Sequence, residues 1–206
     1  MKIKAAIVGA SGVLGLNLIA QFQQAGRAVR ALVRNQKKVK WLLQGESEAL
    51  WCDLLAIPPS LLTEQLKGCD VVIHAASEIP LQAQHAGDWE KNNRLRMEGT
   101  SRLIDASLRA GVGLYLQAST VSAYIHGGEK RLDEATPFDI IPSRAVETLA
   151  VADMERRVRE IPPDRMSWAI LRLGTLTGPG TLQDLLIRDL WAGKVLVAGD
   201  GSHFIS

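Results

Sequence analysis

Acidic residues are missing from the first 45 positions of this 206-residue chain, and the first of them is Glu46. The same stretch carries eight basic residues and a formal charge of +8, whereas 16 basic and 22 acidic residues give residues 46–206 a charge of −6. The net charge of +2 therefore hides a strong asymmetry. Such an asymmetry indicates a basic partner site in the first quarter of the chain.

Cysteines and long apolar runs are also scarce. Cys52 and Cys69 are the only cysteines, so the sequence has no disulfide framework, and we expect a reducing, cytoplasmic location. The four histidines lack metal-ligand spacing, and we expect no metal site. No apolar run reaches the roughly 18 residues of a membrane span, and glycines interrupt the apolar N-terminus that a signal peptide would need. We therefore expect no membrane partner.

Short apolar runs alternate with longer helical patterns along the chain. We expect strands at residues 4–8, 28–33, 49–52, 71–75, 114–117, 167–171 and 195–197. Helices are predicted at residues 12–25, 58–66, 88–110, 144–160 and 181–192. Strands that are apolar along their length are typical of a parallel sheet covered on both faces. The predicted fold class is α/β, with one doubly wound parallel sheet over residues 1–206.

A glycine-rich loop joins the first predicted strand to the first predicted helix. Its spacing is G-x-x-G-x-x-G, and glycines there permit a tight turn and a close approach of backbone to a pyrophosphate. The helix N-terminus adds free N–H groups and a partial positive charge. The alternative interpretation is a tight turn without a ligand. The expected cofactor-binding residues are Gly9, Ser11, Gly12, Val13, Leu14 and Gly15.

The end of the second predicted strand has no carboxylate, and this absence bears on the choice of dinucleotide. A carboxylate there would accept hydrogen bonds from the adenosine ribose of NAD. The sequence instead places Arg34 there, followed by Lys37 and Lys38. The guanidinium can bind a 2′-phosphate through two charge-assisted hydrogen bonds, and either lysine could add a second cation. The sequence favours NADP over NAD, the alternative being a solvated basic turn.

The whole pattern resembles the short-chain dehydrogenase/reductase superfamily, in its extended and atypical branches, which include NAD-dependent epimerases and dehydratases. Beside the glycine loop, the resemblance rests on residues 51–54, 70–76, 118–124 and 172–175. Residues 29–40 look most like NADPH-dependent reductases of the dihydroflavonol type, in which the residues matching Arg34 and Lys38 hold the 2′-phosphate. The resemblance implies a Rossmann fold and further cofactor contacts from Asp53, Leu54, Ala75, Ala76, Ser119 and Leu173.

The proton-transfer pattern of this superfamily, a Tyr with a Lys four residues later, is absent. The fourth residue after Tyr115 is a serine, and the fourth after Tyr124 is a glycine. Aligning the charged helix on residues 154–155 places Glu147 at the Tyr position and Val151 at the Lys position. The Asn that the superfamily carries in its long helix falls on Arg96.

Two explanations of the missing pair remain open. In the first, the site uses another acid, Tyr124 or Glu147, while Thr120 orients the substrate. A Glu would then need a pKa raised by burial to donate a proton near neutral pH. In the second, the protein binds NADP(H) without turning it over, as a sensor or an assembly factor. Tyr124 would then be a packed residue at a strand end, and Glu147 a solvated helix carboxylate.

The last nine residues look like a segment that runs on, in related proteins, into another strand and a substrate subdomain. We expect that subdomain to be missing, or only begun after residue 178, so the small-molecule substrate is not identified. A homodimer through the two long helices is a further expectation from the resemblance. Nucleic acid is not an expected partner, because the basic residues flank a glycine loop without an aromatic stacking platform.

Overall fold

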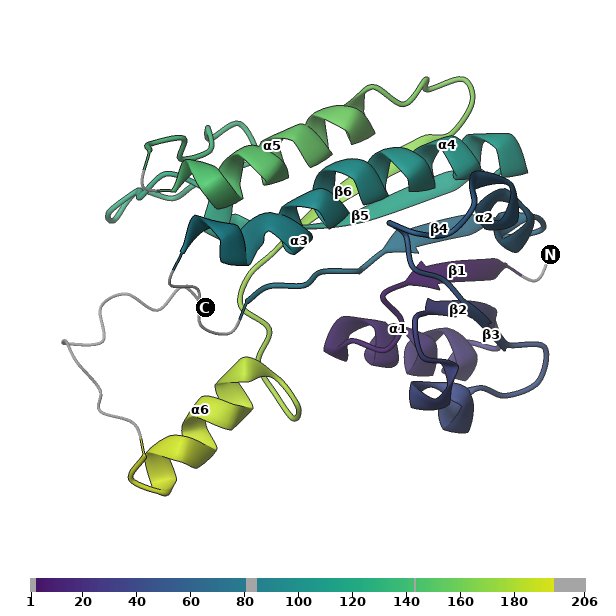
Figure 1. Cartoon of the computed structure of the whole chain (residues 1–206), viewed down its shortest axis with the longest axis horizontal. Helices are drawn as coiled ribbons and strands as arrows, with labels where there is room; N and C mark the ends of the chain where they lie inside the picture. The colour runs from purple at the N-terminus through teal and green to yellow at the C-terminus, as the bar shows by residue number, and fades with distance from the viewer. Residues whose placement is uncertain (1–2, 81–84, 143, 195–206) are drawn as a thin grey trace.

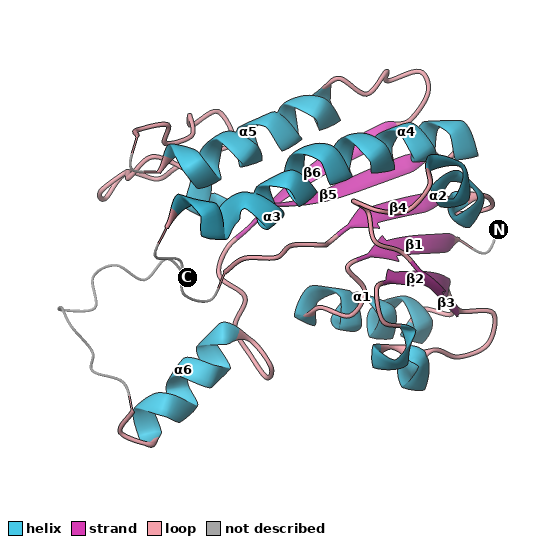
Figure 2. Cartoon of the chain, in the orientation of Figure 1, coloured by secondary structure: helices cyan, strands magenta, loops and turns pink. Residues whose placement is uncertain are grey.

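A parallel six-stranded sheet with helices on both faces forms the body of the computed structural model, which describes residues 3–80, 85–142 and 144–194 (Figures 1 and 2). The strand order is β3-β2-β1-β4-β5-β6, and every neighbouring pair is parallel. The chain runs outward from β1 to β2 and β3, and then crosses back to β4 on the other side of β1. Because the direction changes there, a crevice forms at the carboxyl ends of β1 and β4. The predicted doubly wound fold is confirmed.

The six predicted strands that fall on described residues are present. β5 runs three residues further than predicted, because Ser119 points into a buried polar network and Thr120 still pairs with Leu173. The strand predicted at residues 195–197 lies outside the described residues. The bounds are β1 (Lys4–Val8), β2 (Ala28–Val33), β3 (Glu48–Trp51), β4 (Val71–His74), β5 (Leu114–Thr120) and β6 (Ser167–Leu173).

The helix predicted at residues 88–110 is built from several pieces. A 3₁₀ turn, η3 (Ala86–Trp89), leads into α3 (Glu90–Arg94), a π-helical turn, η4 (Leu95–Gly99), and α4 (Thr100–Ala110). Gly111 ends the helix in a left-handed conformation, with φ of 75°. The other helices are α1 (Val13–Gln24), α2 (Pro59–Leu66), α5 (Ala145–Arg159) and α6 (Leu182–Trp191), and short 3₁₀ turns are η1 (Gln36–Lys38), η2 (Lys40–Leu42) and η5 (Val121–Ala123).

Two apolar cores lie on opposite faces of the sheet. Alternate residues of β1 divide between them, since Ala6 and Val8 join the core under α2, α4 and α5, while Ile7 joins the core under α1. α6 lies apart from the sheet (Figure 1), and its Trp191 is 88% exposed. None of the helices in the described part of the chain is both long and apolar enough to cross a membrane.

Candidate functional site

A cavity of about 810 Å³ follows the carboxyl ends of the strands, from the glycine loop after β1 to the segment after β6. Residues that follow each of the six strands contribute to its wall. In doubly wound sheets, ligands bind in this crevice, outside the carboxyl ends of the strands. The cavity is therefore the candidate cofactor site.

The glycine loop is too tight for side chains at two of its positions. Gly9 has φ of 82°, and a Cβ atom there would lie 2.5 Å from the Cα atom of Ala76. A Cβ atom at Gly15 would lie 2.4 Å from the carbonyl oxygen of Gly9, so Gly15 serves the packing of α1 against the loop. The close turn directs the N-terminus of α1, with its unpaired first-turn N–H groups, to the cavity that Gly12 and Val13 line.

The structure brings most of the predicted cofactor-binding residues together. Gly15 and Lys38 are the exceptions, because neither lines the cavity and Lys38 is exposed on η1. A cation that was not predicted from the sequence, Lys91 of α3, lines the cavity. The predicted residues that line the cavity are Gly9, Ser11, Gly12, Val13, Leu14, Arg34, Asp53, Leu54, Ala75, Ala76, Ser119 and Leu173.

Arg34 is paired with a carboxylate at the cavity wall. Its Nη1 donates to Glu78 Oε1 at 3.0 Å, and Lys91 Nζ donates to the same oxygen at 2.9 Å. Burial alone would raise the pKa of Glu78, but hydrogen bonds from Lys91 and Arg34 outweigh it and lower the pKa. Asn92 is fully buried, and its side chain accepts a hydrogen bond from the Glu78 backbone N–H at 2.9 Å. This contact fixes the backbone at Glu78. Residues 1–45 contain no acidic side chain, and Glu78 thus provides the negative charge beside Arg34.

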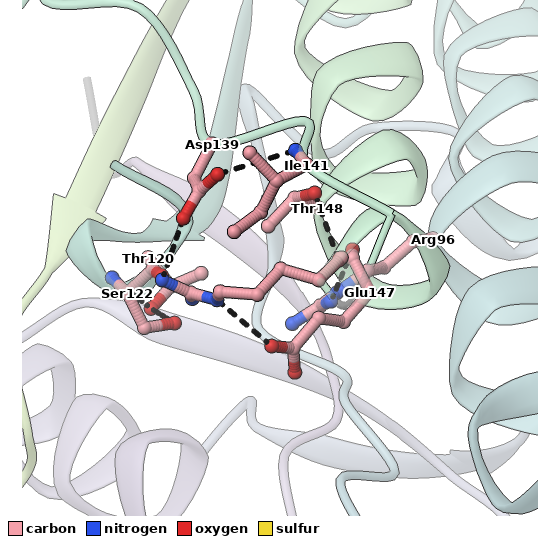
Figure 3. A network of polar contacts seen from close by, with 8 residues as sticks. Arg96, Thr120, Ser122, Asp139, Ile141, Glu147 and Thr148 are labelled. Atoms are coloured by element: carbon pink, nitrogen blue, oxygen red, sulfur yellow. Dashed lines mark hydrogen bonds and ion pairs between the residues drawn. The ribbon is translucent and has the colours of Figure 1, made fainter. Parts of the chain in front are cut away.

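A second, smaller cavity of about 90 Å³ adjoins the first beyond Thr120. Thr120 Oγ1 lies 2.8 Å from Ser122 Oγ and accepts a hydrogen bond from the Ser122 backbone N–H at 3.1 Å. These two hydroxyls face Arg96 and Glu147 across the site (Figure 3). Both cavities are lined by Ile79, Arg96, Thr120 and Ser122.

Glu147 lines the smaller cavity and is ion-paired at its edge. Its Oε1 lies 3.5 Å from Arg144 Nε, and Arg144 Nη1 in turn lies 3.5 Å from Asp139 Oδ2 (Figure 3). The carboxylate of Glu147 is therefore engaged by the guanidinium of Arg144. Arg96 Nη1 donates a hydrogen bond to the Glu147 backbone oxygen, at 3.5 Å. Arg96 stands where the superfamily carries an Asn in its long helix, and it was not among the predicted site residues.

Tyr124 lies outside both cavity linings. Its hydroxyl accepts a hydrogen bond from Arg172 Nη1 at 2.6 Å, and the Arg172 guanidinium lies 4.9 Å from the centroid of its ring. The same guanidinium lies 4.6 Å from the ring centroid of Phe138. The structure therefore brings Thr120 and Glu147 to one cavity but places Tyr124 in a separate packing cluster.

A buried carboxylate anchors that cluster to the sheet. Glu155 of α5 is fully buried, and Arg172 Nη2 donates to its Oε2 at 2.8 Å. Ser119 Oγ donates to Oε1 and Arg159 Nη2 to Oε2, both at 2.6 Å. Burial alone would raise the pKa of Glu155, but hydrogen bonds from Arg172, Ser119 and Arg159 outweigh it and lower the pKa. The network holds α5 against β5 and β6 beneath the cavity floor.

Solved structures share this fold. MoeE5 in complex with UDP-glucose and NAD matches with a TM-score of 0.79 and 25% identity, over 97% of this chain and 65% of that chain. A UDP-glucuronic acid 4-epimerase from Bacillus cereus, in complex with UDP-glucuronic acid and NAD, also has a TM-score of 0.79. Its identity is 19%, over 97% of this chain and 67% of that one.

Curated relatives include a reductase and an assembly factor. The 3-diazoavenalumate denitrifying reductase of a Streptomyces species is 30% identical over 85% of this chain, which spans 57% of that protein's length. The photosystem II assembly factor Ycf39 of Guillardia theta is 29% identical over 57% of this chain and 35% of its own length. A model of the NAD dependent epimerase/dehydratase family matches residues 5–204, so the chain belongs to that family.

Proposed function

We propose that the protein binds NADP(H) and acts as a reductase on a small-molecule substrate, with a proton-transfer site that departs from the Tyr–Lys pair of its superfamily. The observation that carries this proposal is the continuous cavity from the glycine loop to Thr120, with Arg34 and Lys91 on its wall. Two cations beside the end of β2 suit the two negative charges of a 2′-phosphate. The 30% identity to a reductase supports the reaction class.

The reacting end of the proposed site contains few groups that can handle a proton. When bound, a nicotinamide cofactor supplies or accepts a hydride. Thr120 and Ser122 present adjacent hydroxyls at the junction of the two cavities, where they can hydrogen-bond a substrate oxygen. We assign orientation of the substrate to Thr120. Glu147 is the carboxyl group that lines the smaller cavity, and it is paired with Arg144.

A second candidate function is NADP(H) binding without turnover, as in a sensor or an assembly factor. The ion pair at Glu147 and the position of Tyr124 outside both cavities favour it, because the first engages one candidate acid and the second keeps the other away from the site. Similarity to Ycf39 over 57% of the chain is consistent with it. The relatives compared are longer than this chain, so either activity is proposed for the whole protein.

Cofactor preference is tested by thermal shift with NADPH and NADH, since a ligand that binds the native state raises its stability. We expect a larger shift with NADPH. Arg34→Gln should weaken NADPH binding about tenfold, about 1.4 kcal/mol, with little change for NADH. Arg109→Gln, an exposed change on α4, is the matched control. Equal shifts with the two cofactors in the wild-type protein would overturn the assignment.

Turnover is tested by deuteride transfer from deuterated NADPH to the small molecules of a cell extract, detected by mass spectrometry. A reductase labels a product, and Thr120→Val should slow the labelling because it removes one of the two paired hydroxyls. No labelling by a wild-type protein that binds NADPH supports the non-catalytic function instead.

A further inference from the structure

The smaller cavity has mixed walls. Apolar or aromatic surface comes from Ile79, Trp89 and Val151, and polar groups come from Arg96, Thr120, Ser122, Thr148 and the ion-paired Glu147. We call it the Arg96 cavity. Since Arg96, Thr120 and Ser122 also line the larger cavity, a molecule reaching past Thr120 enters the Arg96 cavity with its leading end.

Arg96 is a cation whose charge is poorly balanced. Its one hydrogen bond within the described residues runs to the neutral backbone oxygen of Glu147, at 3.5 Å. Burial lowers the pKa of the Arg96 guanidinium, partly offset by the charge of Glu147. Arg94, two residues earlier, is by contrast paired with Glu98 at 2.9 Å. A guanidinium has five N–H donors, so Arg96 retains donors for a further acceptor.

The nearest carboxylates are held by another cation. The guanidinium of Arg144 lies 3.5 Å from a carboxylate oxygen of Glu147 and 3.5 Å from one of Asp139. Asp139 Oδ1 also accepts a hydrogen bond from the Ile141 backbone N–H at 3.2 Å. The Glu147 carboxylate is thus directed to Arg144, and no ion pair joins it to Arg96 in the part of the chain that the structure describes.

We propose that the Arg96 cavity binds a carboxylate group of the substrate. The planar guanidinium matches a carboxylate with two parallel hydrogen bonds, and the hydroxyls of Thr120 and Ser122 can donate to the same group. The apolar walls suit an organic acid with an aromatic or aliphatic body. This inference rests on the proposed function, because it takes the junction at Thr120 as the place where substrate meets cofactor.

The test uses benzoate and benzamide as probes, which share a shape and differ in charge. Each is titrated into the protein by NMR, with and without saturating NADP⁺. We expect the wild-type protein to bind benzoate at least tenfold tighter than benzamide. Arg96→Gln should remove that preference, and Arg96→Lys should keep part of it, because an ammonium retains the charge but lacks the planar fork.

A second variant separates anion binding from a structural role. Glu147→Gln removes a like charge beside the cavity, so benzoate should bind about threefold tighter than in the wild-type protein. The loss of a merely structural contact would not strengthen binding. Arg94→Gln, two residues before Arg96 and outside both cavity linings, is the matched control and should leave the binding of both probes unchanged. Equal binding of the two probes to the wild-type protein, or equal loss of benzoate in Arg94→Gln, would overturn the proposal.

The design also separates this inference from the proposed function. Benzoate preference without NADP⁺ binding would contradict the cofactor assignment and support the carboxylate site. NADP⁺ binding without benzoate preference would support the cofactor assignment and contradict the carboxylate site. If Arg96→Gln fails to fold, Arg96→Lys and Glu147→Gln still decide the question.

Discussion

The two ends of the large cavity are built differently. At the glycine loop, backbone forms the wall, and the Cβ-free positions Gly9 and Gly15 let the loop, α1 and the segment after β4 approach closely. Beyond Thr120, side chains form much of the wall, among them Arg96, Ser122 and the ion-paired Glu147. A backbone site tolerates changes elsewhere in the chain, whereas a side-chain site is altered by one substitution. The cofactor end can therefore persist while the reacting end diverges.

The largest expected effect is at the buried carboxylate beneath the reacting end. Glu155→Gln leaves Arg172 without its buried counter-charge, and breaking such a pair costs about 3–5 kcal/mol of the free energy of unfolding. Urea denaturation measures this loss. Asp153→Asn on the same helix, which disturbs the more exposed Arg156 and Arg157, should cost roughly 1 kcal/mol or less. Similar losses in both variants would mean that the buried network does not support the reacting end.

The cofactor end is tested by two glycines with positive φ. Gly9→Ala should cost about 3 kcal/mol, from the left-handed backbone and from a Cβ atom 2.5 Å from the Ala76 backbone, and should impair NADPH binding. Gly26→Ala, at φ of 66° with open space around it, should cost only the backbone strain, about 1 kcal/mol. The difference between the two, by thermal or urea unfolding, isolates the close approach. An equal cost would contradict it.

A smaller effect on cofactor binding is expected at Glu78, which pairs with Arg34 and Lys91 at the cavity wall. Glu78 is an internal anion that competes with a 2′-phosphate for Arg34 and Lys91. Glu78→Gln should tighten NADPH binding about fivefold, about 1 kcal/mol, and leave NADH unchanged. Isothermal titration measures both, with the exposed Glu98→Gln as control. An equal change for the two cofactors would show that Glu78 does not act through the 2′-phosphate.

The residues at the glycine-loop end of the cavity could be predicted from the sequence because their pattern is local. The loop from Gly9 to Gly15 and the apolar strands are recognisable within short windows, and the alternation of strands with helices indicates a parallel sheet. The pair between Arg34 and Glu78 joins residues 44 positions apart, and no spacing rule connects them. The orientation of Tyr124 is set by Arg172 from β6, 48 positions away, so its hydroxyl could not be assigned to a cavity from sequence.

The π-helical turn η4 (Leu95–Gly99) also sets the rotation of the chain that precedes it. A π turn takes in one residue more than an α turn, and one residue corresponds to about 100° of rotation. α4 is fixed by its buried side chains, Leu103 among them, so the extra residue changes the direction in which everything before the turn projects. Arg96 lies within this turn. A single-residue insertion or deletion there would re-aim Arg96 without altering its identity, a route to new specificity that leaves the sheet untouched.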